Sequence, residues 1–93
     1  MDTIVIDLVD IQSPQELHLK FKTELGFPDF YGMNWDAFWD AITGLVDMPE
    51  EMILKNWKAL ETRMPSDAEI LKSLIANFNR ESVDCEIAIE QVY

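Results

Sequence analysis

The sequence predicts an α/β fold, in which a three-stranded parallel sheet packs with about four helices. Short apolar segments rich in β-branched residues lie near the start, the middle and the end of the chain. The segments between them carry helix caps and apolar residues at helical spacing. Strands separated by helices need crossover connections, which produce parallel pairing. With 93 residues the chain has room for one domain, residues 1–93.

The first strand is predicted over residues 3–8, whose nearly continuous apolar character is typical of a strand buried on both faces. The first helix is predicted over residues 14–25. Its start carries a capping box and its end a C′ glycine: Ser13, Pro14 and Glu16, then Gly26. Apolar residues spaced by four share one face of this helix: Leu17, Phe21 and Leu25.

An aromatic loop, residues 27–33, leads to a second helix that begins after the N-cap Asn34 and stops at Thr43-Gly44. A second strand is predicted over residues 52–55. A short helix with Asn56 as its cap follows and ends before Pro65. The last helix is predicted behind a capping box at residues 66–69. Its apolar stripe comprises Ile70, Leu71, Leu74, Ile75 and Phe78. The third strand is predicted over residues 85–89.

The net charge of −11 argues against binding to nucleic acid or to an anionic membrane surface, because both carry negative charge. It favours a basic protein, or a cation, as the partner. Cys85 is the single cysteine, so no internal disulfide forms. The sequence lacks the basic start and following apolar run that are typical of a signal peptide, and none of its segments approaches the length of a membrane span. We therefore expect a cytoplasmic protein.

Signatures of catalysis are missing from the sequence, which contains no phosphate-binding glycine loop, no dinucleotide fingerprint and no nucleophile elbow. His18 is the single histidine, and its position away from the apolar face of its helix predicts an ordinary surface residue. Cys85 lies in a predicted core strand, which favours a buried structural thiol over a nucleophile. We expect no enzyme activity, no cofactor and no metal.

The second predicted helix separates into an acidic and an aromatic row. Asp36 and Asp40 are four residues apart and share a face, and Thr43 extends their row. The other row comprises Trp35, Phe38, Trp39 and Ile42, of which at least one aromatic should be buried. The acidic row is interpreted as a solvated face, as a weak divalent-cation site or as a protein-binding surface. Two carboxylates are few ligands for calcium, and no second segment supplies a partner for acid–base chemistry. The neighbouring aromatic loop favours protein binding, since aromatic residues are enriched at interfaces and carboxylates bind arginine well.

Residues 30–44 are the most informative segment of the chain. The segment Phe30-Tyr31-Gly32-Met33-Asn34-Trp35-Asp36-Ala37-Phe38-Trp39-Asp40-Ala41-Ile42-Thr43-Gly44 resembles the signature of barstar-type ribonuclease inhibitors. The resemblance extends over essentially the whole chain, including Pro28 ahead of the loop and Trp57 after the second strand. It implies a single barstar-like domain with a three-stranded parallel sheet and four helices.

The resemblance also implies a function as an intracellular immunity protein, or antitoxin, that blocks the active site of a basic, extracellular-type ribonuclease. By this resemblance Asp40 occupies the position of a substrate phosphate and Asp36 pairs with an arginine. Tyr31, Asn34, Thr43 and Gly44 supply packing and hydrogen bonds. The implied partner-binding residues are Phe30, Tyr31, Gly32, Asn34, Asp36, Ala37, Trp39, Asp40, Thr43, Gly44 and Leu45. We expect the protein to be monomeric when free.

The sequence departs from the family pattern at several positions. Phe30 and Leu45 replace a tyrosine and a tryptophan of the best-known member, and residues 49–52 resemble an insertion. An acidic contact expected late in the last helix falls on Arg80 or Glu81, depending on a one-residue gap. The alternative function is an acidic interaction module on the same fold that binds another basic partner without inhibiting a nuclease.

Overall fold

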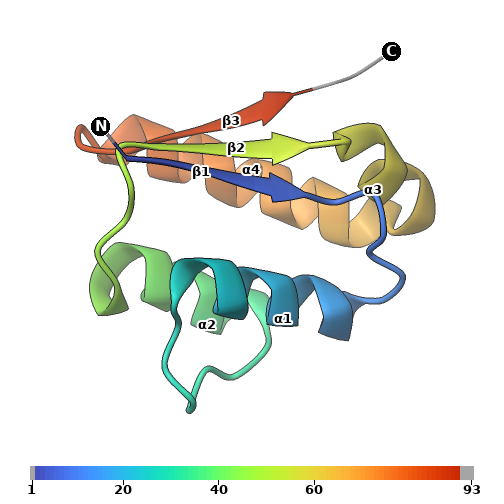
Figure 1. Cartoon of the computed structure of the whole chain (residues 1–93), viewed down its shortest axis with the longest axis horizontal. Coiled ribbons are helices and arrows are strands. Elements are labelled where there is room, and N and C mark those ends of the chain that lie inside the picture. Colours follow the sequence, from blue (N-terminus) through green and yellow to red (C-terminus); the bar gives the residue numbers. More distant parts are fainter. Residues whose placement is uncertain (1, 91–93) are drawn as a thin grey trace.

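Eight elements follow one another along residues 2–90, the part of the chain that the computed structural model describes (Figure 1). Their order and bounds are β1 Thr3–Asp7, α1 Pro14–Leu25, α2 Trp35–Asp40, the π-helix η1 Ala41–Leu45, β2 Glu51–Lys55, α3 Trp57–Arg63, α4 Pro65–Glu81 and β3 Glu86–Glu90. The predicted fold class is confirmed: three strands form a parallel sheet that packs with four α-helices.

The sheet has the order β1-β2-β3, with β2 in the centre and parallel to both neighbours. α1 packs against β1, and α4 packs against β3. The strand side chains that point toward these helices are buried, including Ile6, Leu54 and Ile87. Phe21, Phe38 and Trp57 are the largest fully buried side chains and fill the space between the sheet and the helices. Cys85 is buried too, as predicted.

The prediction that the first strand is buried on both faces is wrong. Val5 is 48% exposed, and Thr3 and Asp7 on the same face are also exposed. The residues that pair with Val5 along this face, Ile53 in β2 and Ala88 in β3, are partly exposed. The helices therefore cover one face of the sheet. An apolar run in the sequence does not distinguish a strand with two covered faces from one with a partly apolar open face.

The predicted caps at both ends of α1 are confirmed. The Ser13 side chain accepts a hydrogen bond from the Glu16 backbone N–H at 3.2 Å, and Gly26 adopts the left-handed conformation with φ +71°. The left-handed backbone conformation at this position favours glycine.

Asn56 occupies the predicted N-cap position of α3 without a side-chain capping hydrogen bond, and the predicted capping box of the last helix is wrong. Asn56 precedes α3, but its side chain donates to Asp7 Oδ1 at 2.7 Å, so it makes no cap bond. The same hydrogen bond lowers the pKa of Asp7. The last helix begins at Pro65, not behind a Ser66 cap, because the fixed φ of proline suits the first helical turn.

The second predicted helix extends one residue beyond Gly44 and changes type. α2 continues directly into η1, and the Val46 backbone N–H donates to the Ala41 carbonyl at 3.2 Å, across five residues. Such π-turns are rare insertions in helices and often occur at functional sites. No helix among residues 2–90 has the length and apolar character that crossing a membrane requires.

Candidate functional site

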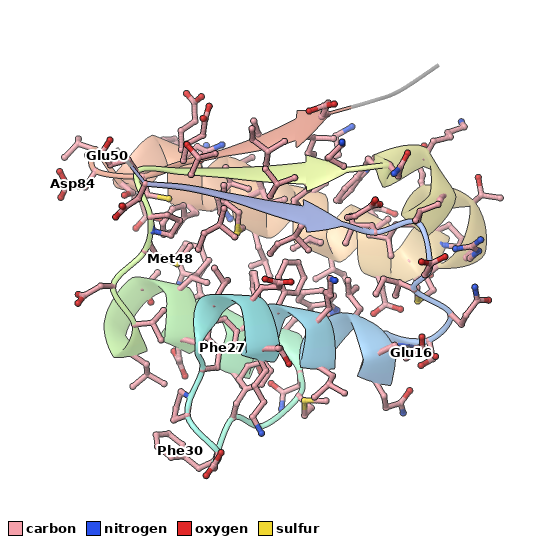
Figure 2. All side chains as sticks on the ribbon, viewed as in Figure 1. Glu16, Phe27, Phe30, Met48, Glu50 and Asp84 are labelled. Carbon is pink, nitrogen blue, oxygen red and sulfur yellow. The ribbon has the colours of Figure 1, made fainter. Side chains whose placement is uncertain are left out.

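The aromatic loop between α1 and α2 divides its aromatic side chains between the core and the solvent. Phe27 and Tyr31 are buried and pack against each other, with ring centroids 4.7 Å apart. The Tyr31 backbone N–H donates to the Pro28 carbonyl at 3.0 Å and closes a turn. Phe30 lies at the tip of this turn and is 75% exposed (Figure 2). The buried rings therefore hold the loop while Phe30 faces the solvent.

His18 corrects the sequence prediction, because it is 3% exposed and not a surface residue. Its Nδ1 and the Tyr31 hydroxyl share a hydrogen bond of 2.7 Å, and the centroid of its ring lies 4.4 Å from a ring centroid of Trp35. Burial lowers the pKa of His18, and the negative charge of Asp67 opposes this shift. Burial also raises the pKa of Tyr31. These contacts connect α1, the aromatic loop and α2.

The chain from Gly32 to Asn34 sets the start of α2. Asn34 Oδ1 accepts from the Ala37 backbone N–H at 2.8 Å, and Asn34 Nδ2 donates to the Gly32 carbonyl at 3.2 Å. A Cβ at Gly32 would lie 3.2 Å from Asn34 Nδ2, so the Asn34 side chain would have to shift by a few tenths of an ångström to admit a larger residue. Met33 has φ +55°, a conformation uncommon for a residue with a side chain. This turn directs α2 out of the loop.

α2 presents the two predicted rows. Phe38 is fully buried against Phe21, and Trp35 is half-buried with its Nε1 donating to Asp67 Oδ1 of α4 at 3.0 Å. Asp36 and Asp40 are exposed. The two ion pairs of the described chain lie elsewhere, at Lys20–Glu24 and Lys58–Glu61. The carboxylates of Asp36 and Asp40 therefore remain available to a partner.

A groove of about 460 Å³ lies between α2 and α4 beside these carboxylates. Its lining residues are Trp35, Asp36, Trp39, Asp40, Ile70, Leu74 and Asn77. The three α4 residues were not predicted as site residues, because their proximity to Asp40 arises only when α4 packs on α2. Arg80 donates to the Asn77 side chain, whereas Glu81 lines a different pocket beyond Trp39. Asn77, and neither Arg80 nor Glu81, is among the residues that line this groove.

The π-helix η1 presents the remaining predicted site residues. The Thr43 hydroxyl donates to the Trp39 carbonyl at 2.6 Å, and Thr43, Gly44 and Leu45 are all exposed. Gly44 has no positive φ, and a Cβ at this position would have no neighbour within 4 Å. The fold alone does not require glycine at residue 44.

The structure exposes most of the predicted partner-binding residues, and the loop, α2 and η1 that carry them form the candidate surface. The exposed members are Phe30, Gly32, Asn34, Asp36, Asp40, Thr43, Gly44 and Leu45. Ala37 and Trp39 are half-buried at its edge. Tyr31 is 6% exposed, so its side chain supports the surface from below. Residues 2–90 contain no group of three or more His, Cys, Asp or Glu side chains arranged to hold a metal ion.

Comparison with known proteins identifies the family to which the chain is similar. Residues 1–93 match the protein family described as Barstar (barnase inhibitor). The chain is also 39% identical, over 84 residues, to a Bacillus subtilis (strain 168) protein named "Putative ribonuclease inhibitor YrdF". The aligned region covers 90% of this chain and 92% of that protein.

Proposed function

We propose, from the premise that this chain belongs to the barstar family, that it inhibits a barnase-like ribonuclease by covering the active site of the enzyme. One observation carries the proposal. Asp36 and Asp40 lie one turn apart on an exposed helix face, next to an aromatic loop, and neither belongs to an ion pair of residues 2–90. The "Putative ribonuclease inhibitor" name of the Bacillus subtilis relative supports the same role.

The chemistry of the two carboxylates suits a ribonuclease active site. Such a site binds the phosphates of RNA with arginine, lysine and histidine side chains, and a carboxylate offers similar acceptor oxygens. We assign Asp40 to the position of a substrate phosphate and Asp36 to a bidentate pair with an arginine. Phe30, Asn34, Thr43, Gly44 and Leu45 are exposed on the loop, α2 and η1, and we assign them to contacts around these carboxylates.

The net charge of −11 also favours fast association with a basic partner. Only two of the 18 Asp and Glu residues are assigned to the centre of the interface. Most others act at a distance, because a negative field attracts a basic protein and increases the rate of encounter. This attraction should weaken as salt concentration rises. We further propose that the ribonuclease is a basic, extracellular-type enzyme and that this chain protects the cytoplasm of the producing cell as an immunity protein.

RNA cleavage by a barnase-like ribonuclease, with and without this protein, tests the proposed function. We expect inhibition by the wild-type protein and strong loss of inhibition by Asp40→Ala. The matched control is Glu90→Ala, which removes an equal charge from an exposed site at the end of β3. Absence of inhibition at low salt and micromolar concentration would overturn the proposed function. Equal effects of Asp40→Ala and Glu90→Ala would show that the assigned surface is wrong.

A further inference from the structure

The helix α2 is too short to be stable by itself. It comprises the six residues Trp35–Asp40, and Phe38 is its one fully buried side chain. Isolated helices shorter than about 12–15 residues are marginal in water, so contacts with other elements fix where such a helix lies. The positions of Asp36 and Asp40, which α2 carries, therefore depend on these contacts.

Trp35, the first residue of α2, makes two kinds of contact with its surroundings. Its ring packs against His18 and Phe38, with centroid distances of 4.4 Å and 5.4 Å. Its indole Nε1 donates a hydrogen bond to Asp67 Oδ1 at 3.0 Å. Among residues 2–90, this is the one side-chain hydrogen bond that joins α2 to α4. Trp35 therefore connects the first turn of α2 to a helix from a distant part of the chain.

Asp67 is a well-supported acceptor for this hydrogen bond. It lies in the first turn of α4, where the helix dipole stabilises a carboxylate. The next residue, Ala68, is 2% exposed, and α4 packs against α3 and β3. Asp67 is partly buried, and neither ion pair within residues 2–90 includes it. The packing of α4 thus holds the carboxylate to which the Trp35 indole binds.

Trp35 also belongs to the candidate ribonuclease-binding surface. Its side chain lines the groove of about 460 Å³ together with Asp36 and Asp40, whereas Asp67 does not line this groove. Asp36 follows Trp35 directly in the sequence, so a displacement of the first turn of α2 displaces both residues. A change at Asp67 can therefore reach Asp36 through Trp35 without touching the groove.

We propose that Asp67 is a positioning residue for ribonuclease inhibition. Through the indole of Trp35 it holds the first turn of α2, and with it the Asp36 carboxylate, in the orientation that the ribonuclease binds. This inference rests on the proposed function, since Asp36 is assigned to the same partner. Without the hydrogen bond the turn gains freedom, and ordering it again on binding costs affinity.

NMR spectra of the free protein test the first step, from Asp67 to the turn. Asp67→Ala removes the acceptor, Asp67→Asn keeps an acceptor oxygen, and Glu69→Ala removes an equal charge from an exposed residue of α4. In ¹H–¹⁵N spectra, Asp67→Ala should shift the Trp35 indole resonance and the amides of Asp36 and Ala37. Asp67→Asn should shift them less, and Glu69→Ala should leave them in place. Unmoved resonances in Asp67→Ala would overturn the proposal.

Inhibition of a barnase-like ribonuclease tests the second step, from the turn to binding. Asp67→Ala should weaken binding about fivefold, and Asp67→Asn and Glu69→Ala by less than about twofold. Thermal melting shows whether each variant is folded at the assay temperature. Trp35→Phe keeps an aromatic ring but lacks the indole N–H, so it should weaken binding by a factor similar to that of Asp67→Ala. It provides the test if Asp67→Ala does not fold, and inhibition equal to that of the wild type would then overturn the proposal.

The double variant Trp35→Phe/Asp67→Ala distinguishes positioning from other roles of Asp67. It should bind the ribonuclease no more weakly than Trp35→Phe alone, because Asp67 acts through the missing N–H. A direct contact of Asp67 with the ribonuclease, or an unrelated effect on α4, would make the two effects add, and additive effects would overturn the proposal.

Failure of this inference is distinguishable from failure of the proposed function. Inhibition by the wild type with equal effects of Asp67→Ala and Glu69→Ala would overturn the positioning role and leave the proposed function standing. Failure of the wild type itself to inhibit would overturn the proposed function, and with it the role of Asp67 in inhibition.

Discussion

Replacing Gly44 by alanine should make the free protein more stable and the inhibitor weaker. Gly44 lies in the π-helix η1, lacks a positive φ, and has open space where a Cβ would project. Glycine within a helix costs about 0.5–1 kcal/mol relative to alanine, because it loses more backbone entropy on folding. The fold therefore gains nothing from glycine at this position. We therefore predict that the backbone of the partner approaches closely at Gly44.

The expected change in melting temperature follows from the free-energy cost of glycine within a helix. For a domain of this size, a change of 1 kcal/mol shifts the melting temperature by about 4–8 °C, so Gly44→Ala should raise it by about 2–8 °C. If the ribonuclease lies against residue 44, the added methyl group must displace it. We expect the dissociation constant of the complex to rise about tenfold or more, which corresponds to about 1.4 kcal/mol.

Circular dichroism melting and inhibition of RNA cleavage measure the two effects on the same preparation. Gly26→Ala is the control, because Gly26 adopts φ +71°, where a side chain costs about 1–2 kcal/mol. This control should be less stable yet inhibit normally while folded. The reasoning is refuted if Gly44→Ala lowers the melting temperature, since the fold would then need glycine there. It is also refuted if Gly44→Ala stabilises the protein and leaves inhibition unchanged.

Three further changes test the support of the surface. Burial lowers the pKa of His18 below its ordinary value of 6.5, so the unfolded chain binds this proton more readily. The free energy of unfolding should therefore fall as pH drops below about 6.5, and urea unfolding should show a flatter pH profile for His18→Gln; equal profiles would contradict this. Asn34→Ala removes the cap of α2 and should cost about 1 kcal/mol in urea unfolding, and no loss would show that the cap is dispensable. Phe30→Ala should change stability by less than about 0.5 kcal/mol, because the ring is exposed, while weakening inhibition severalfold in the cleavage assay. Unchanged inhibition would remove Phe30 from the interface.

The local features of the fold were predictable because neighbouring residues determine them. Ser13, Pro14 and Gly26 mark the ends of α1 through caps and backbone preferences that act over a few residues. The spacing of Asp36 and Asp40 places both on one side of a helix, whatever packs against it. For the same reason, the division of α2 into an acidic and an aromatic row was predictable.

The errors have a common cause in packing between distant segments. His18 is next to Leu17, at the border of the apolar face, and it is buried because the loop with Tyr31 and α2 with Trp35 pack over it. Val5 is exposed because no helix of residues 2–90 covers the outer face of the sheet. The groove with Asn77 exists because α4 packs against α2, 37 residues after Asp40 in the sequence.

The sequence by itself determined the parallel α/β fold, the acidic character and the signature segment from Phe30 to Gly44. Short-range spacing and side-chain chemistry are sufficient for these properties. Only the tertiary structure decided that Phe30 is exposed while Tyr31 is buried, that a π-turn presents Gly44, and that Trp39 separates two depressions. Burial and concavity depend on which elements meet in space, and residues far apart in the chain supply the opposite walls.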